Sequence, residues 1–480
     1  MQSCSRSPLR GLRAGKVHVV GLAGSGVRGI VPLLCDLGMN VTGSDKDDSP
    51  VLEEFRRRGI KCWVGHSQGN VTPGTDLVLI SAAIADDNPE VRAAESRSIR
   101  VLKYAQCLGY LMREKQGIAV AGTHGKTTTS AMVCSVLMSA GLDPSFLIGG
   151  EHPDLGGGSH AGKGRHFVAE ACEFDRSFLN LAPQAAVVTN VEEDHLDYFE
   201  SLADIRLAFR EFVELLPDDG LLVYNRDDRH SRFLPTVSRA RARSFSLEAS
   251  GADWWVEDLC FEREGSRFVL RGPGGDSVPV RLAVPGLHNV KNSLACAAIC
   301  SWAGVPVSEI ALGLSGYRNV RRRFDVLRRE PCTIVDDYAH HPTEVRMVVR
   351  TARQVFPGRR IVCIFQPHQY SRLRVMLDGF AESLREADEV VVTRVYRARD
   401  SEDDVRSVHG SWLAAAIQAR GGRGRYVEKF SEATALLDDL RAPDTVFVFL
   451  GAGDITTLAH RYAQSVGAPS LRVPGRAVAV

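Results

Sequence analysis

The chain has 480 residues, of which 44% are hydrophobic and 24% charged, and its formal net charge is +1. This length predicts about three domains, and the near-zero net charge excludes a whole-chain field that would attract nucleic acid or a membrane surface. Eleven cysteines are scattered without a Cys-x-x-Cys pair, which favours a reducing, cytoplasmic compartment. The apolar segments are shorter than the ~20 residues that a membrane span requires, so no membrane partner is expected.

Strands and helices alternate at the start of the chain, after a lead-in of residues 1–15 that we expect to be disordered. Apolar strands at 17–22, 41–45 and 77–80 are separated by helical patterns, which predicts βαβ units and a parallel sheet. The first turn contains Gly24-x-Gly26-x-x-Gly29. A diphosphate can rest on such a helix N-terminus, whether it belongs to NAD or to a nucleotide-diphosphate sugar; a plain turn without a ligand is the alternative.

The stretch from Ile118 to Ser130 is the strongest functional signal. An apolar strand runs into Gly122-Thr-His-Gly-Lys-Thr127, and a helical pattern follows. Backbone N–H groups of such a loop bind phosphate oxygens, and the helix dipole adds favourable potential. Lys126 would reach the β- and γ-phosphates of a nucleoside triphosphate, and the Thr127 hydroxyl would bind Mg²⁺. A tight turn without a ligand would leave Gly-Lys-Thr unexplained.

The rest of this region predicts the surroundings of the phosphate loop. Residues 91–116 are expected to be a helical connector, and residues 148–151 and 156–159 to be glycine-rich loops. Strands at 167–170 and 185–188 end near Glu173 and His195, which are candidate Mg²⁺ ligands, although Mg²⁺ prefers oxygen. The alternatives are a solvated loop carboxylate and a histidine satisfied by its neighbours.

Further along, residues 245–285 alternate apolar and polar side chains with Gly and Pro breaks, which predicts a small antiparallel sheet. A helix is expected at Ser293–Trp302. Asn289 and Asn292 precede it and are either helix caps or contacts to the edge of an adenine.

The last third of the chain predicts a second doubly wound sheet. Buried strands are expected at 333–335, 361–365, 390–393 and 446–450, and three of them end in polar clusters. Residues 451–454, Gly-Ala-Gly-Asp, predict another loop-to-helix anion site. The basic run before Phe324 is either a solvated linker or a contact to phosphate.

These three regions together suggest that ATP activates a group carried by the ligand of the first domain. A carboxylate that approaches a triphosphate is repelled, since two unit charges ~4 Å apart cost about 4 kcal/mol at an effective dielectric constant of ~20. Catalysis therefore needs concentrated positive charge from Lys126, Mg²⁺ and the arginines of the third domain. Closure of separate domains would keep water from a labile acyl phosphate.

Six segments carry a resemblance to a known family. They are residues 121–129 (Ala-Gly-Thr-His-Gly-Lys-Thr-Thr-Thr), 190–197, 288–292, 322–325, 336–344 and 365–372. In this order and spacing the chain, from about residue 16, resembles the Mur ligases of peptidoglycan synthesis, and most of all their alanine-adding branch. The resemblance implies an α/β fold of three domains: a UDP-binding Rossmann-like domain (1–115), a central phosphate-loop ATPase domain (116–320) with a mostly parallel sheet and a small antiparallel piece, and a Rossmann-like amino-acid domain (321–480).

The resemblance also implies an ADP-forming enzyme. The lactyl carboxylate of UDP-N-acetylmuramate attacks the γ-phosphate of ATP, and L-alanine then displaces phosphate from the acyl phosphate. The expected cofactors are ATP and two Mg²⁺ ions; no nucleic acid partner is expected, and the chain would be a monomer or homodimer. A recycling ligase that attaches a murein tripeptide to the same sugar nucleotide is the alternative.

Site residues follow from the same resemblance, position by position. The implied catalytic residues are Lys126, Glu173, His195, His340 and Arg372. The implied ATP contacts are Gly122, Thr123, His124, Gly125, Lys126, Thr127, Thr128, Asn289, Asn292 and Arg323. The implied contacts to the UDP-sugar are Gly21, Gly24, Gly26, Ser44, Asp45, Ser81, His124 and Asn190. The implied metal ligands are Thr127, Glu173 and His195, and the implied amino-acid contacts are Tyr338, His340 and Arg372.

Some positions depart from the family pattern. Ala23 and Arg28 replace the usual residues of the first glycine loop, and Gln369 stands where many members have arginine. Residues 196–214 contain no lysine that could be carbamoylated, as in the alanine-adding branch. An Asp-Asn-Pro-Arg motif of the diaminopimelate branch is absent. An NAD-dependent oxidoreductase and a nucleotide-gated regulatory module remain alternatives from other classes.

Overall fold

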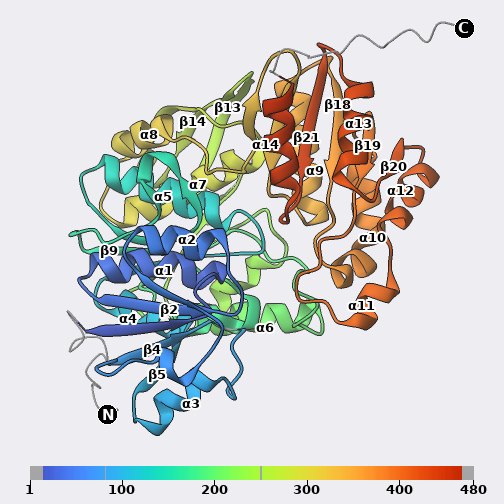
Figure 1. Ribbon diagram of the computed structural model, residues 1–480. Helices are drawn as coiled ribbons and strands as arrows, with labels where there is room; N and C mark the ends of the chain where they lie inside the picture. Colours follow the sequence, from blue (N-terminus) through green and yellow to red (C-terminus); the bar gives the residue numbers. More distant parts are fainter. Residues whose placement is uncertain (1–14, 82, 249–250, 467–480) are drawn as a thin grey trace, which may run out of the picture. The chain divides into compact units, whose positions relative to one another are not determined.

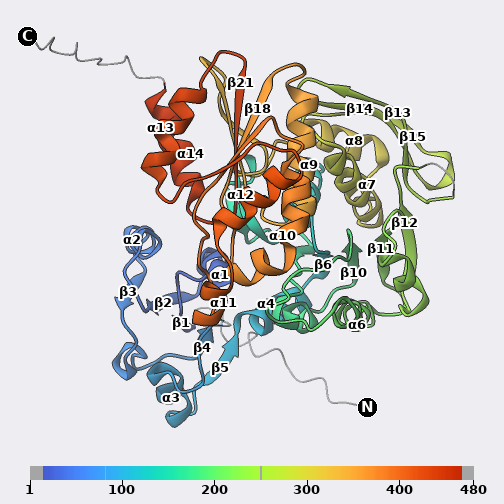
Figure 2. The ribbon, with the colours of Figure 1, turned by 90° about the vertical axis from the view of Figure 1, so that its right-hand side faces the viewer.

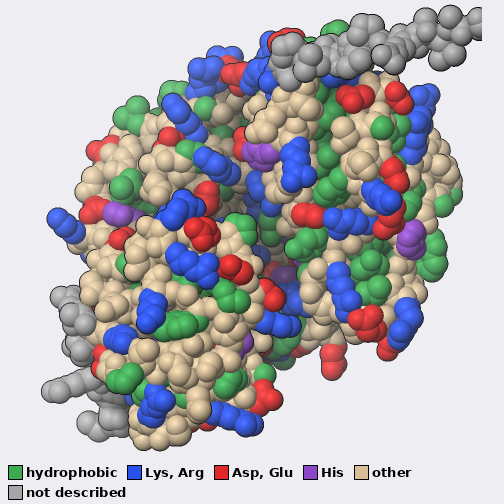
Figure 3. Space-filling view, viewed as in Figure 1, with side chains coloured by type: hydrophobic (Ala, Val, Ile, Leu, Met, Phe, Trp, Pro, Cys, Tyr) green, Lys and Arg blue, Asp and Glu red, His purple; other side chains and the backbone are tan. Residues whose placement is uncertain are grey.

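The computed structural model describes residues 15–81, 83–248 and 251–466, and the chain divides into two compact units between Arg321 and Arg322 (Figure 1). The first unit contains three sheets and the second unit one. The expected disordered lead-in lies outside the described residues. Among the described helices, none is both long and apolar enough to cross a membrane. Positive and negative side chains are interspersed on the face shown in Figure 3.

The amino-terminal sheet of the first unit is parallel throughout, with strand order β3-β2-β1-β4-β5, as the alternating pattern predicts. Its strands are β1 (Lys16–Val20), β2 (Asn40–Asp45), β3 (Lys61–Val64), β4 (Leu77–Ile80) and β5 (Arg100–Lys103). Its helices are α1 (Ser25–Asp36), α2 (Pro50–Arg57), α3 (Pro89–Ser96) and α4 (Tyr104–Arg113).

The expectation of a helical connector at residues 91–116 is wrong in its middle. Helix α3 ends at Ser96, and Ser98 has a φ of +56°, which turns the chain out of the helix. Strand β5 then pairs with β4 and completes the sheet before α4 begins.

The central sheet of the first unit has the strand order β12-β11-β10-β6-β9-β7-β8 and is parallel except for the β7–β8 pair. Its strands are β6 (Gln116–Ala121), β7 (Ser145–His152), β8 (Gly157–His160), β9 (His166–Glu170), β10 (Ala185–Val188), β11 (Leu221–Asn225) and β12 (Arg241–Phe245). Helix α6 (Leu202–Val213) packs on one face, in the core that it shares with α1 and α4.

Strands β7 and β8 replace the glycine-rich loops that the sequence led us to expect at 148–151 and 156–159. The glycines allow close pairing: a Cβ at Gly158 would lie 3.0 Å from the carbonyl oxygen of Gly150. A Cβ at Gly149 would lie 2.6 Å from a carboxylate oxygen of Glu170. These glycines are therefore needed because a side chain would not fit between the paired strands, and not because the segment forms a loop.

The other face of the central sheet is covered by α5 (Lys126–Ser139), α7 (Leu287–Trp302) and α8 (Val307–Gly316). The predicted antiparallel sheet is present as β13 (Trp255–Glu262), β14 (Gly265–Arg271) and β15 (Ser277–Leu282), and β15 lies against α8 (Figure 2). Three fully buried thiols, those of Cys134, Cys296 and Cys300, lie in the core that α5 and α7 share. The Sγ atoms of Cys296 and Cys300 are 3.8 Å apart.

The second unit is a single sheet of order β16-β17-β21-β18-β19-β20, parallel except for β16. Its strands are β16 (Asp325–Arg328), β17 (Thr333–Asp337), β18 (Arg360–Phe365), β19 (Glu389–Val392), β20 (Gly424–Tyr426) and β21 (Thr445–Leu450). Its helices are α9 (Pro342–Val355), α10 (Tyr370–Leu384), α11 (Glu402–Ser407), α12 (Gly410–Ala419), α13 (Phe430–Leu440) and α14 (Ile455–Ser465). Helices α9, α10 and α12 cover one face and α13 and α14 the other (Figure 2). The predicted doubly wound sheet is confirmed.

Candidate active site

The phosphate loop connects β6 to α5, as the sequence predicts. Gly122 has a φ of +132° and Gly125, the residue before the helix, a φ of +82°. A Cβ at Gly122 would collide with the Thr189 hydroxyl, and a Cβ at Gly125 would lie 2.7 Å from the Asn292 side-chain oxygen. Only glycine satisfies both the backbone conformation and the space at these two positions. The N–H groups at the start of α5 can therefore reach an anion.

Lys126 is held inside this loop by three acceptors. Its Nζ donates to the carbonyl oxygens of Gly122 (2.6 Å) and Thr123 (3.1 Å) and to the Glu173 carboxylate (2.9 Å). Burial would lower the pKa of Lys126, but the charges of Glu173, Cys172 and Glu170 and the hydrogen bond to Glu173 together outweigh it and hold the pKa above its usual value. Glu173 is only 2% exposed, so the two side chains neutralise each other in a buried place.

Thr127 contacts a carboxylate that the sequence interpretation missed. Its hydroxyl donates to Glu170, whose two oxygens lie at 3.0 and 2.9 Å, and the Gly149 N–H donates to the same carboxylate at 2.7 Å. Glu170 is the last residue of β9 and pairs in register with Val120 of β6. The signal was present in the sequence, because a strand predicted to end at Glu170 beside the phosphate loop places its last side chain at the same edge.

His195 has a φ of +53°, a conformation that non-glycine residues rarely adopt. Its backbone N–H donates to the Asp194 carboxylate at 2.7 Å, and its ring lies 5.1 Å from the ring of Phe174. Its Nδ1 atom is buried and has no hydrogen-bond partner among the described residues. A strained residue with an unsatisfied buried nitrogen is typical of a ligand-binding position.

The candidate metal ligands have a chemistry that suits a magnesium ion, and a hydrogen bond joins two of them, Thr127 and Glu170. Thr127, Glu170 and Glu173 supply oxygen atoms, which Mg²⁺ prefers, and His195 supplies a nitrogen without a partner. Of the two glutamates, Glu170 is bonded to Thr127, whereas Glu173 is bonded to Lys126. The structure therefore adds Glu170 to the candidate ligands that the sequence suggested.

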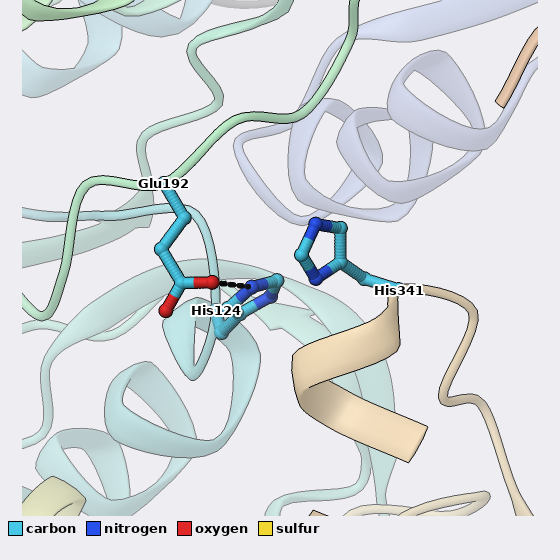
Figure 4. A group of neighbouring side chains, drawn as sticks. All are labelled: His124, Glu192 and His341. Atoms are coloured by element: carbon cyan, nitrogen blue, oxygen red, sulfur yellow. Dashed lines mark ion pairs between the residues drawn. The ribbon is translucent and has the colours of Figure 1, made fainter. Parts of the chain in front are cut away.

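His124 and Asn190 brace the outer side of the loop. The His124 N–H donates to the Asn190 side-chain oxygen at 2.8 Å, and the Asn190 amide donates back to the His124 carbonyl at 3.1 Å. The His124 ring lies 3.5 Å from the Glu192 carboxylate. Figure 4 shows these two side chains pointing toward each other. Thr123 accepts a hydrogen bond from the Glu192 N–H at 2.9 Å. Thr128 is buried in the first turn of α5.

Helix α7 brings two asparagines to the phosphate loop. The helix begins at Leu287 rather than at Ser293, so Asn289 and Asn292 lie within its first turns, and Gly286 is the residue before it. The Asn289 amide donates to the Pro285 carbonyl at 2.6 Å, and Asn292 lies beside Gly125. The interpretation of these asparagines as N-caps is therefore wrong.

The first glycine loop is folded against the ends of β1 and β2. Gly21 has a φ of +79°, and its N–H donates to the Ser44 carbonyl at 2.9 Å. The Asp45 carboxylate accepts from the Ala23 N–H at 2.8 Å, so Asp45 shapes the loop. A Cβ at Gly21 would lie 3.0 Å from the Ser81 hydroxyl, and one at Gly26 would meet the Tyr104 ring at 3.2 Å. Gly24, the residue before α1, donates its N–H to the Gly21 carbonyl.

Ser44 points into a buried polar network rather than to the edge of the sheet. Its fully buried hydroxyl donates to Glu90 at 2.6 Å, and Glu90 also accepts from Asn70 at 2.6 Å and contacts His18 at 3.2 Å. Burial would raise the pKa of Glu90, but hydrogen bonds from His18, Ser44 and Asn70 outweigh it and lower the pKa. The Ser44 hydroxyl is thus used in a hydrogen bond within the protein, and Ser44 contacts the glycine loop only through its backbone carbonyl.

The predicted amino-acid residues lie together at strand ends of the second unit. His340 follows β17, and its Nδ1 lies 3.1 Å from the Tyr338 carbonyl oxygen. The His340 ring meets the His368 ring edge-on at 5.8 Å, and His368 lies after β18. Nη1 of Arg372, on α10, lies 3.4 Å from Nδ1 of His368. Arg323 places its guanidinium 5.3 Å from the centre of the Tyr338 ring.

The anion site expected at residues 451–454 is already filled by protein groups. The Ile455 N–H, the first of α14, donates to the Gln366 side-chain oxygen at 3.1 Å. The Asp454 carboxylate accepts from the Gln366 amide at 2.6 Å and pairs with Arg394 at 2.7 Å. A carboxylate at this helix start opposes a second anion, so the expectation is wrong.

Three family models match successive parts of the chain. The model described as Mur ligase family, catalytic domain, matches residues 16–116, the Mur ligase middle domain matches residues 120–300, and the Mur ligase, glutamate ligase domain, matches residues 322–453. The chain belongs to the Mur ligase family.

Curated Mur ligases resemble this chain along nearly its whole length. The UDP-N-acetylmuramate–L-alanine ligase of Acetivibrio thermocellus is 37% identical over 450 residues, covering 93% of this chain and 95% of that protein. The enzyme of the same name from Acidithiobacillus ferrooxidans is 41% identical over 458 residues, covering 94% and 98%.

Solved Mur ligase structures have the same fold. A UDP-N-acetylmuramate-alanine ligase from Thermotoga maritima matches with a TM-score of 0.79 at 31% identity, over 94% of this chain and 98% of that one. A murein peptide ligase from Psychrobacter arcticus matches with a TM-score of 0.69 at 23% identity, over 95% of this chain and 99% of that one. At this identity the match establishes a shared fold and not a shared activity.

Proposed function

We propose that this Mur ligase joins L-alanine to the lactyl carboxylate of UDP-N-acetylmuramate, with ATP as the energy source, in cytoplasmic synthesis of peptidoglycan precursors. The observation that carries the proposal is a complete phosphate loop in a chain that is 37–41% identical to alanine-adding ligases over at least 450 residues. The recycling alternative has weaker support, since the murein peptide ligase is 23% identical against 31% for the alanine ligase structure.

The phosphate loop supplies the charge that the first step needs. The lactyl carboxylate attacks the γ-phosphorus of ATP, a carboxylate–phosphate bond forms, and ADP leaves. The backbone N–H groups at the start of α5 and the Lys126 ammonium are placed to neutralise the transferring phosphoryl group. Lys126 must exchange part of its contact with Glu173 for the phosphate, so the buried pair holds the ammonium ready in the free enzyme.

We propose that magnesium is held by Thr127 and Glu170, with Glu173 and His195 as further ligands. Such an ion supplies electrostatic neutralisation of the phosphate oxygens. Glu170 itself is oriented by the Gly149 N–H and by the Thr127 hydroxyl, so its carboxylate needs little reorganisation when the site is loaded. Asn289, Asn292 and Arg323 are the proposed contacts to the rest of the nucleotide.

The second unit is proposed to bring the amino acid. Arg372 offers a guanidinium for the carboxylate of L-alanine, and it contacts His368, whose ring meets that of His340. His340 and Tyr338 both follow β17. The amine of alanine then attacks the acyl carbon, the amide bond forms, and phosphate leaves with the electron pair of the broken bond. We propose the domain bounds 1–115, 116–320 and 321–480, a division supported by family models that match residues 16–116, 120–300 and 322–453.

An ADP-release assay with UDP-N-acetylmuramate, ATP and Mg²⁺ tests the proposed function. We expect ADP release with L-alanine, and amide product by mass spectrometry, and much less turnover with the murein tripeptide. Glycine and L-serine belong in the same screen. ADP release that depends on the tripeptide and not on alanine would establish the recycling ligase instead. No nucleotide consumption with any amine would refute ligase activity.

A further inference from the structure

Two arginines share one aromatic ring at the start of the second unit. The guanidinium carbons of Arg322 and Arg323 lie 4.9 and 5.3 Å from the centre of the Tyr338 ring. Distances below about 6 Å permit a cation–π attraction. Tyr338 is half-buried, and its backbone N–H donates to the Arg322 carbonyl at 2.8 Å. The ring and the backbone of Tyr338 thus hold the same short segment from two sides.

The backbone of that segment is strained, and contacts from neighbouring residues hold it in this conformation. Arg322 and Phe324 have φ values of +59° and +50°, although neither is glycine. The Arg322 guanidinium donates to the Gly451 carbonyl at 2.6 Å, and the Phe324 N–H donates to the Asp337 carboxylate at 2.7 Å. Such conformations persist only where surrounding contacts fix them, and they concentrate at functional positions. Arg323, between the two strained residues, has its backbone fixed in this way.

The Arg323 side chain has several rotatable bonds, and fixing them when a ligand binds has an entropic cost. The Tyr338 ring restricts this freedom, because it attracts the guanidinium to one face. Preorganisation of this kind improves ligand affinity without adding a contact to the ligand.

We propose that Tyr338, besides its place among the amino-acid residues, is a positioning residue that holds the Arg323 guanidinium ready for the nucleotide. The inference rests on the proposed function, because it takes Arg323 as a nucleotide contact. One side chain then belongs to both substrate sites, so replacing it changes nucleotide affinity as well as alanine affinity.

A pair of Tyr338 variants in the full chain separates the ring from the hydroxyl. Tyr338→Phe keeps the aromatic face, whereas Tyr338→Leu replaces it by an aliphatic side chain. Phe430→Leu is the matched control, since Arg394 lies 5.0 Å above the Phe430 ring in the same unit without touching the proposed sites. Nucleotide affinity is measured with ATP alone by calorimetry, and the Arg323 Nε–H resonance, assigned with Arg323→Lys, reports the ring current of Tyr338.

We expect Tyr338→Leu to weaken ATP binding by about 2- to 30-fold, the range of a cation–π contact, and to remove the upfield shift of the Arg323 signal. Tyr338→Phe should keep the ATP affinity within about twofold and should retain the upfield shift of the Arg323 signal. Phe430→Leu should change neither the ATP affinity nor that shift. The double variant Tyr338→Leu with Arg323→Ala should bind ATP no more weakly than Arg323→Ala alone, because the ring acts through that arginine.

Other results would overturn the inference. Equal ATP affinity of Tyr338→Leu and the wild type, with weaker binding by Arg323→Ala, would remove the positioning role. Additive losses in the double variant would show that the ring acts by another route. Unchanged ATP binding by Arg323→Ala would refute the nucleotide role of Arg323 and the inference with it. A protein that passes these binding tests but forms no amide would refute the proposed function alone.

Discussion

The Thr127 hydroxyl donates to the Glu170 carboxylate, whose oxygens lie 3.0 and 2.9 Å away, across the ends of two adjacent strands of the central sheet. This bond links the first turn of α5 to the end of β9. It gathers a hydroxyl and a carboxylate at one point beside the phosphate loop. Hard oxygen donors in this arrangement are suited to Mg²⁺.

Replacing Glu170 should therefore change the requirement for magnesium. We expect Glu170→Gln to raise the Mg²⁺ concentration for half-maximal ADP release at least about tenfold, because the amide keeps the size but loses the charge. Glu151→Gln, an exposed glutamate on β7, is the control and should behave as the wild type. An unchanged Mg²⁺ titration of Glu170→Gln would assign the ion to other residues.

Loss of the Lys126 charge should stop the chemistry while the sugar nucleotide still binds. We expect Lys126→Ala to lower the turnover of ADP release by more than about 100-fold, the usual effect of removing one donor to the transition state. The affinity for UDP-N-acetylmuramate, measured by calorimetry, should remain within about twofold. Turnover within about tenfold of the wild type would contradict the role of Lys126.

Lys126→Ala also leaves the Glu173 carboxylate buried without its cation. The double variant Lys126→Ala with Glu173→Gln removes that unpaired charge and controls for misfolding. It should regain thermal stability without regaining activity.

Arg372 should matter for the amino acid rather than for the sugar nucleotide. We expect Arg372→Ala to raise the KM for L-alanine at least about tenfold, since a charge-assisted contact to a carboxylate is lost. Binding of UDP-N-acetylmuramate should be nearly unchanged. Arg374→Ala is the control, because Arg374 lies on the same helix and pairs at 3.5 Å with Asp404. Equal losses for both substrates would refute the assignment.

The second unit should become locally more stable as the pH falls from 7 to 5. Burial raises the pKa of Asp337 to about 6, whereas the usual value is 3.8. The folded chain therefore binds a proton that the unfolded chain releases in this window, and the stability gained is lost as the pH rises through about 6. The full shift corresponds to ~3 kcal/mol.

Hydrogen exchange of peptides from β17, corrected for the intrinsic rate at each pH, measures this effect. In Asp337→Asn the dependence on pH should be weaker. The variant should also be less stable at every pH, because Asp337 accepts from the Ala339 and Phe324 N–H groups and an amide oxygen replaces only one of its two acceptors. The same slope in both proteins would show that another group titrates.

Apolar strands and the phosphate loop could be predicted because their signals are local. The strands at 77–80 and 185–188 have the predicted bounds, since each is a short run of apolar residues with clear breaks. Strands β7 and β8 were not predicted, and their glycine-rich parts were expected to be loops. Those residues have no side chains to reveal a strand, and they are in the sheet because of their neighbours.

The site was predictable where chemistry follows from one segment and not where it depends on distant pairing. Lys126 and Thr127 stand in the phosphate loop itself, but the partner of Ser44 is Glu90, on α3. The side chain of Ser44 turns away from the sheet edge into the face that α3 covers, and a single sequence does not show which helix will cover a face. Glu170 was missed because the residues after the strand, rather than its last residue, were taken as the ligands.

The buried thiols of Cys134, Cys296 and Cys300 can report how often the helices around them open. A thiol-alkylating reagent reaches them only when α5 and α7 separate, because all three are fully enclosed. The rate at which these thiols are labelled would therefore measure how often α5 and α7 open next to the phosphate loop. A nucleotide that binds only the folded state stabilises it, so saturating ATP should slow the labelling, and the ratio of the two labelling rates would report how strongly the ligand stabilises this layer.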